Sequence, residues 1–420
     1  MSAVTREKNI GIVDRLRGEF GFITGNFAVL VVSWLVVDFF AELPGTYYPL
    51  YVKALGGTAG TIGLIGAAEM VARGLVQIPG GYLADKYGRK WLIMTMTGLA
   101  GISRIFYVFA PTWEWIAIGA IILGLTGIYQ PALEALIADS IPPERRGMGF
   151  GIVRLIGSVS TTPSPLIAGF LFLRMGLVPT MQLSYGLAAV GFVAAAVMRT
   201  RLKETVENPS KIDIGNIVKS YPTSFRESVN VWHKVESGAF VLFIINVLTT
   251  FTIGIFTPVF TLFMVDDIGI PEFQLSLIMA SMFITMIIFA LPSGKIIDMI
   301  GKKKPMLTGF ILWTLAVPLF IYGDFWRLIL AMTLIGVLQV LFSSAGAAFL
   351  ADLVPKEHRG KVNGSIGFFS LIGMSIGQLI GGWMYDNVSH TLPFWIQIAL
   401  MIPAFLLVLL FIKEPEKIQR

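Results

Sequence analysis

The sequence predicts an all-α membrane protein with twelve transmembrane helices, arranged as two pseudo-symmetric six-helix bundles. Three observations carry this prediction. Hydrophobic residues make up 55% of the 420 positions and charged residues only 14%, whereas soluble domains carry roughly 25% charged residues. Apolar windows of about 20 residues, the length that crosses a bilayer core, recur along the whole chain. Two sequence motifs recur 213 residues apart and divide the chain into halves.

The apolar windows are long and continuous, which favours helices over strands, because a helix satisfies its backbone hydrogen bonds within one segment. In chain order the expected spans are 22–49, 60–83, 91–110, 114–138, 147–173, 178–198, 237–265, 273–297, 305–322, 326–351, 362–385 and 391–412. Pro44 and Gly45 should kink or end the first helix. The expected domains are a tail over 1–21, an N-terminal bundle over 22–198, a linker over 199–236, a C-terminal bundle over 237–412 and a tail over 413–420.

Lysines and arginines outside the spans gather on one side of the predicted membrane. Lys53, Arg174 and Arg327 fall on the other side. The positive-inside rule then places both termini in the cytoplasm, in a cell inner or plasma membrane. This topology accounts for the net charge of +6 without a nucleic-acid partner. The absence of cysteine excludes disulfides and thiolate chemistry.

The first repeated motif is PGGYLADKYGRK at 79–90, echoed by PSGKIIDMIGKK at 292–303. Gly81 and Gly88 permit a tight turn and close backbone approach, while Arg89 and Lys90 anchor the loop on the cytoplasmic side. Asp85 is suited to accept backbone N–H groups at the start of another helix. The matching residues of the second copy are Gly294, Asp298, Gly301, Lys302 and Lys303.

The second repeated motif is ADSIPPERRGMGFG at 138–151, which aligns with ADLVPKEHRGKVNG at 351–364. Asp139 and Arg146 of the first copy match Asp352 and Arg359 of the second. Both motif pairs stand at the same spacing, so we interpret the chain as a duplicated scaffold whose halves move against each other.

With its pattern G-x-x-x-D-x-x-G-R-[RK] between the second and third spans, the chain resembles the major facilitator superfamily of secondary transporters over nearly its whole length. In pattern it is similar to proton-coupled drug-efflux members. The resemblance implies alternating access, with Asp85 latched onto the start of the eleventh helix, near Lys361–Gly364, to hold the cytoplasmic gate shut. The fifth span departs from efflux members because it lacks their G-P-x-x-G-G signature, which weakens an antiporter assignment.

Charged residues inside the spans are candidates for function, because a charge at membrane depth is costly. They occur in the first half, at Asp38, Glu42, Glu69, Arg73, Arg104, Glu134 and Arg154, and a shift of 213 lands on uncharged residues in every case. We expect Asp38, Glu42, Glu69 and Arg73 to couple protons or hold substrate. The alternatives are a structural ion pair of Asp38 with Arg104 and of Glu69 with Arg73, which stand one turn apart. Asp139, Arg146 and Arg154 are assigned to the gating network.

The family resemblance also implies a central cavity lined by the first, fourth, seventh and tenth helices. The polar and aromatic candidates there are Trp34, Tyr129, Gln130, Asn246, Phe251, Phe256, Gln339 and Phe342. An aromatic wall with one or two acids suits lipophilic or cationic molecules. Ordinary helix packing is the alternative for each of these residues.

The predicted function is secondary active transport by alternating access, as proton-coupled export of a small amphipathic or lipophilic molecule. The alternatives are proton-coupled uptake of a small polar or anionic metabolite, and a lipid flippase, scramblase or non-transporting receptor of the same fold. An enzyme is not expected, because the chain has no phosphate-binding loop and its three histidines have no metal-ligand spacing. We therefore expect no cofactor and no metal. The expected partners are a small-molecule substrate, protons and the lipid bilayer, with the chain as a monomer.

Overall fold

The computed structural model describes residues 21–142, 145–207, 222, 225–355 and 357–414. Within these ranges the chain is helical and contains no strand. Twelve helical segments are long and apolar enough to cross a membrane, and they follow the predicted order. The predicted all-α membrane fold is therefore confirmed.

The N-terminal half contributes six spans, three of which are built from two helices in sequence. Its helices are α2 (Gly25–Glu42), α3 (Tyr48–Ala54), α4 (Ala59–Tyr87), α5 (Lys90–Val108), α6 (Trp113–Thr126), α7 (Gln130–Ser140), α8 (Arg146–Thr161), α9 (Ser164–Met175) and α10 (Leu177–Arg199). The breaks fall beside Pro44, Pro131 and Pro163, because proline lacks the N–H that a helix interior needs. The expected interruption of the first span at Pro44 is thus present.

The C-terminal half repeats the arrangement with fewer breaks. Its helices are α12 (Ser237–Phe256), α13 (Phe260–Leu262), α14 (Glu272–Ile300), α15 (Lys303–Ile321), α16 (Phe325–Leu353), α17 (Arg359–Asn387) and α18 (Leu392–Phe411). A π turn, Phe263–Asp267, follows α13. The predicted seventh span, 237–265, therefore ends its regular helix early, beside Pro258.

Two glycines end helices at one end of the molecule. Gly88 ends α4 with φ +97° and Gly301 ends α14 with φ +84°, a conformation that only glycine adopts without strain. We call this end the motif end, and the end that carries Gly56, Gly176 and Gly269 the opposite end. The role expected of Gly81 is wrong: this residue lies inside α4, and a Cβ on it would meet its nearest neighbour, Pro131, only at 4.0 Å. Its neighbour Gly80 makes the close approach, against the Ile128 carbonyl.

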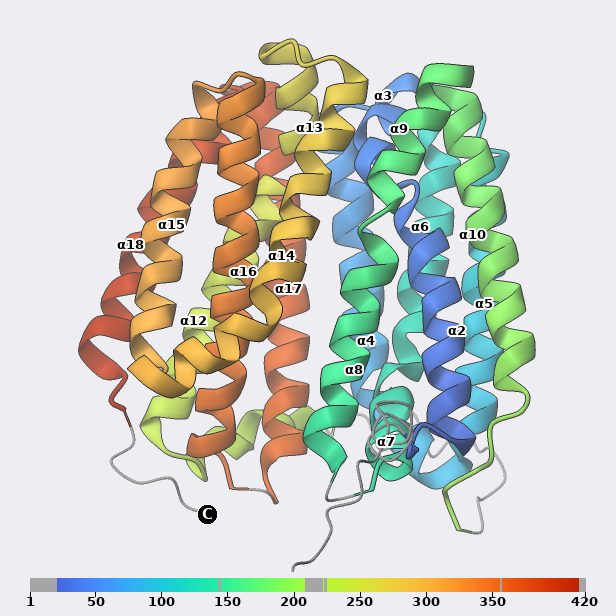
Figure 1. Ribbon diagram of the computed structural model, residues 1–420, viewed down its shortest axis with the longest axis vertical. Helices are drawn as coiled ribbons and strands as arrows, with labels where there is room; N and C mark the ends of the chain where they lie inside the picture. The colour runs from blue at the N-terminus through green and yellow to red at the C-terminus, as the bar shows by residue number, and fades with distance from the viewer. Residues whose placement is uncertain (1–20, 143–144, 208–221, 223–224, 356, 415–420) are drawn as a thin grey trace, which may run out of the picture.

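The two halves lie side by side in Figure 1, α2 to α10 in blue to green and α12 to α18 in yellow to red. They meet mainly along α4 and α17. Gly63 and Gly66 of α4 pack directly on Gln378 of α17, and Gly382 of α17 packs on the Ala59 carbonyl of α4. Small residues at these positions let the two backbones approach closely, as is usual between helices in membranes.

Candidate functional site

Two acidic residues stand together on α2 in the N-terminal half. Asp38 and Glu42 are one turn apart, so their side chains share a face of the helix, and both are half-buried. Neither carboxylate has a hydrogen bond or ion pair with a described residue. Asp38 faces α8, since a Cβ on Gly157 would lie 3.8 Å from Asp38 Oδ2. Asp38 and Glu42 are therefore membrane-embedded carboxylates without a direct cationic partner in the described chain.

The ion pair considered for Asp38 with Arg104 is not formed. The Arg104 guanidinium instead lies over aromatic rings, 5.4 Å from the centroid of Tyr107, 5.9 Å from Tyr185 and 5.5 Å from Phe192. Such cation–π contacts stabilise a desolvated arginine. Arg104 thus has a packing role in the N-terminal half.

Glu69 and Arg73 do form a pair along α4. Arg73 Nη2 lies 3.1 Å from Glu69 Oε1, and the arginine side chain is 42% exposed against 19% for the glutamate. Arg73 also packs over Gly127, where a Cβ would lie 2.8 Å from Arg73 Cγ. This ion pair is a sufficient structural explanation for both charges. It is the alternative to a functional role that the one-turn spacing of Glu69 and Arg73 indicated.

Arg199, at the end of α10, was missed as a buried charge. Its side chain is 1% exposed and donates to Ser33 Oγ at 3.1 Å and to Thr97 Oγ1 at 2.5 Å. The guanidinium lies 5.9 Å from the ring centroid of Tyr129. Because Arg199 follows the predicted sixth span directly, it had the pattern of a topology-setting charge at the membrane surface.

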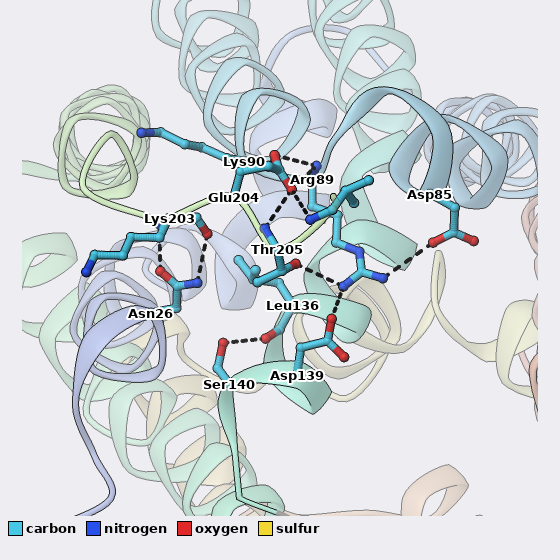
Figure 2. A network of polar contacts seen from close by, with 11 residues as sticks. Asn26, Asp85, Arg89, Lys90, Leu136, Asp139, Ser140, Lys203, Glu204 and Thr205 are labelled. Carbon is cyan, nitrogen blue, oxygen red and sulfur yellow. Dashed lines mark hydrogen bonds and ion pairs between the residues drawn. The ribbon is translucent and has the colours of Figure 1, made fainter. Parts of the chain in front are cut away.

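At the motif end, Arg89 holds together the polar network that Figure 2 shows. Its guanidinium forms an ion pair with Asp139 and donates to Thr205 Oγ1 at 3.1 Å. Asp85 lies 3.5 Å from Arg89 and its side chain is 74% exposed. The expected latch of Asp85 onto the start of α17 is therefore not made in this conformation.

Glu204 performs the capping role that was predicted for Asp85, but on α5 of its own half. Its carboxylate accepts backbone N–H bonds from Arg89, Lys90, Thr205 and Val206 at 2.9 to 3.1 Å. Burial alone would raise the pKa of Glu204, but these donors outweigh it and lower the pKa below that of an ordinary glutamate.

The second motif copy repeats this geometry. Lys302 forms an ion pair with Asp352, as Arg89 does with Asp139. Glu414 accepts the backbone N–H of Lys303 at 2.6 Å, at the start of α15. The sequence signal for both caps is the repeat of LKE at 202–204 in IKE at 412–414, each directly after the last span of its half.

The remaining residues assigned to the gating network make fewer contacts. Asp298 and Gly294 are exposed, and no atom lies within 4 Å of a Cβ built on Gly294. Arg146 and Arg154 belong to α8, but their side chains lie outside the part of the chain whose side chains the structure describes.

At the opposite end, polar contacts tie the halves together. Asp386 of α17 accepts from the hydroxyl of Thr58 at 2.6 Å and from the backbone N–H of Gly60 at 2.7 Å. Lys53 pairs with Asp266 at 2.7 Å. In the described residues, the hydrogen bonds and ion pairs that join the two halves lie here or near mid-length. The described residues thus tie the halves together at the opposite end and form no such hydrogen bond or ion pair at the motif end.

Another contact of this kind is made by the buried Tyr47. Its hydroxyl lies 2.6 Å from Ser276 Oγ and donates to the Glu272 carbonyl at 2.8 Å. Both partners belong to α14, so this tyrosine ties the first span to the C-terminal half.

A cavity of about 370 Å³ lies inside the C-terminal half. Of the predicted cavity residues, Asn246, Phe256, Gln339 and Phe342 line it. The other predicted cavity residues do not line this cavity. Phe251 packs beside Gly373 of α17. Trp34 and Tyr129 pack on a buried cluster of the N-terminal half, and Gln130 lies 3.4 Å from Glu134.

Comparisons with known proteins agree with this architecture. The family model described as Major Facilitator Superfamily matches residues 30–243 and 242–420. An uncharacterized MFS-type transporter of Methanocaldococcus jannaschii is 26% identical over 80% of the chain and 85% of that relative. The quinolone resistance protein NorA of Staphylococcus aureus strain COL is 24% identical over 86% and 90%. The multidrug resistance protein MdtG of Citrobacter koseri is 23% identical over 87% and 89%.

Solved structures of similar fold include a mutant form of the nucleoside transporter NupG. It has a TM-score of 0.71 and 17% identity and covers 92% of this chain and 100% of its own. The human organic anion transporter MFSD10 has a TM-score of 0.68 and 16% identity, with coverage of 91% and 98%. These relatives and structural neighbours are transporters rather than enzymes.

Proposed function

The chain belongs to the Major Facilitator Superfamily and is a transporter, and we propose that it exports small amphipathic or lipophilic molecules in exchange for protons. The observation that carries the proposal is the pair of carboxylates Asp38 and Glu42, which share one face of α2 and have no cationic partner in direct contact among the described residues. A carboxylate at membrane depth is costly in its ionised form, so it holds a proton until water or substrate reaches it.

Alternating access would connect this acidic pair to each side in turn. We propose that the motif end faces the cytoplasm, because the basic residues of the loops gather there. The described conformation, tied at the opposite end by contacts such as Asp386 with Gly60, then faces inward. Asp38 would release its proton to the cytoplasm in the inward-facing state that takes up substrate, and a proton from the outside would return the carrier after substrate release.

The named relatives support export. Two of them are described as a quinolone resistance protein and a multidrug resistance protein, which fits an aromatic, uncharged cavity in the C-terminal half. We also propose that the chain works as a monomer in the cell inner or plasma membrane.

Proton-coupled uptake is the second candidate. It is favoured by Arg73, whose side chain is 42% exposed although it pairs with Glu69, so that it can hold an anionic group. Structural neighbours that include nucleoside and peptide transporters are compatible with this reading. A lipid flippase or scramblase of the same fold is the remaining alternative.

The direction of the driving gradient separates these candidates. The purified chain is reconstituted into liposomes, and uptake of a fluorescent quinolone is followed under an imposed pH gradient, with protein-free liposomes as the baseline. Export by exchange predicts accumulation when the lumen is acidic, since protons leave as substrate enters. Accumulation only when the outside is acidic would indicate symport and contradict the proposal.

A further inference from the structure

The cavity in the C-terminal half has a buried apolar floor and an exposed polar rim. Trp313 of α15, Met332 of α16 and Met401 of α18 line it and are 8%, 1% and 2% exposed. Gln339 and Ser343, which also line it, are exposed. No described residue of its lining carries a charge. A molecule that fills this cavity is therefore held by apolar contact and by neutral hydrogen bonds.

The buried part of the lining contains an unsatisfied donor. Trp313 Nε1 is buried and has no hydrogen-bond partner among the described residues. An indole N–H only donates, and a buried donor without a partner destabilises the structure that contains it. The nitrogen is occluded from the cavity as the indole stands, so an acceptor atom on a bound molecule would satisfy this group once the ring shifts to present it.

The walls favour flat aromatic molecules. Phe256 and Phe260 are stacked with centroids 4.9 Å apart, and Phe310 meets Phe342 edge to face at 5.3 Å. Met279 and Met282 complete this part of the lining. Phenylalanine faces and edges pair with further rings, and thioethers adapt to their outline. The volume of about 370 Å³ lies within the range of ligand pockets, roughly 300 to 1,000 Å³.

We propose that this cavity binds a flat, neutral aromatic molecule whose hydrogen-bond acceptor pairs with Trp313 Nε1. The identification of this ligand as the transported substrate rests on the proposed export function. The site extends away from the boundary between the halves, because α15 and α18 supply part of its floor. Substrate is thus bound in the C-terminal half, while the proton is bound in the N-terminal half at Asp38.

A matched pair of ligands tests the acceptor directly. Fluorenone and fluorene have the same three-ring outline, and fluorenone carries a carbonyl oxygen that fluorene lacks. Equilibrium binding of each, tritium-labelled, is measured on the full chain in lipid nanodiscs, with binding to empty nanodiscs subtracted. The wild-type chain should bind fluorenone at least fivefold more tightly than fluorene, which is the ratio that one neutral hydrogen bond gives, about 1 kcal/mol.

Two variants separate the hydrogen bond from the cavity. Trp313→Phe keeps a ring and removes the donor, so the ratio should fall to about one while fluorene binding stays the same. Trp326→Phe is the matched control, because Trp326 is 74% exposed and outside the cavity; its ratio should equal that of the wild type. Gly309→Leu fills the cavity from α15, where a Cβ meets Phe342 only at 3.8 Å, and should weaken both ligands at least tenfold.

Equal binding of the two ligands to the wild-type chain would overturn the proposal, as would a ratio that persists in Trp313→Phe or undiminished binding in Gly309→Leu. The binding measurement needs no gradient. If the chain binds fluorenone more tightly than fluorene but transports no substrate, the export proposal is refuted and the binding-site proposal stands. If the chain transports substrate but binds both ligands equally, the binding-site proposal is refuted and the export proposal stands.

Discussion

The carboxylate of Asp386 accepts a hydrogen bond of 2.7 Å from the backbone N–H of Gly60, across the boundary between the two halves. The same oxygen accepts from the Thr58 hydroxyl, so the end of α17 caps the start of α4. The family resemblance implied a cap of this kind at the motif end, from Asp85 to the start of α17. In the described conformation the cap is made at the opposite end, and Asp85 is exposed.

Asp386→Ala should open the opposite end. Charge-assisted hydrogen bonds contribute about 1.5 to 3 kcal/mol each, so the population separated at this end should grow by roughly tenfold or more. Pulsed electron resonance between spin labels on Thr112→Cys and Ser389→Cys measures this separation. Asp324→Ala is the matched control, because Asp324 caps α16 within its own half. If both alanine variants give the wild-type distance distribution, Asp386 does not hold the opposite end closed.

Glu204→Gln should destabilise the chain by about 1 to 2 kcal/mol, the usual effect of losing a helix cap. Because the folded state lowers the pKa of Glu204, its contribution is complete above the ordinary pKa of 4.5 and is lost as pH falls through the lower folded value. The difference in melting temperature between wild type and variant should therefore shrink below about pH 4.5. Glu207→Gln, an exposed neighbour, should show no difference at any pH, and a pH-independent effect of Glu204→Gln would contradict the capping role.

Gly88→Ala should destabilise the turn between α4 and α5 by about 1 to 2 kcal/mol, because φ is +97° and the added Cβ would lie 2.8 Å from Glu204 Oε2. Gly294→Ala provides the contrast. That residue lies inside α14 with open space around it, so alanine should stabilise the helix by up to about 1 kcal/mol. Chemical denaturation in mild detergent compares the two, and equal losses of stability would refute this account of the motif glycines.

The absence of cysteine from the sequence makes the proposed topology testable with single substitutions. Lys304→Cys lies at the motif end and Ser389→Cys at the opposite end, and both positions are exposed. A membrane-impermeant maleimide applied to intact cells should label Ser389→Cys and reach Lys304→Cys only after the cells are opened. The reverse pattern would place the motif end outside.

The sequence predicts the scaffold well because its determinants are local or repeated. Apolar length defines the spans, Pro44 and Gly45 interrupt the first, and the motif repeat separates the halves. Gly88 and Gly301 follow the same logic, since a turn with positive φ requires glycine at one defined position. These features can be predicted without knowing which helices contact one another.

The site is less predictable, because its contacts join residues far apart in sequence. Nothing local in the LKE segment indicates that Glu204 caps a helix 115 residues earlier. Arg199 was overlooked because a basic residue at the end of a span is ordinarily a membrane-surface residue. Trp313 was absent from the predicted cavity because the family resemblance pointed to four other helices, whereas α15 also lines the cavity.

The measurement that tests the central claim most directly is quinolone transport by Asp38→Asn in proteoliposomes, followed both under an inside-acid gradient and as exchange at equal pH. We predict that gradient-driven accumulation is lost, at least tenfold below wild type, while exchange without a gradient and the melting temperature are retained. Asp324→Asn, at an exposed acid that caps α16 within the C-terminal half, should keep both activities. Undiminished gradient-driven accumulation in Asp38→Asn would contradict the account.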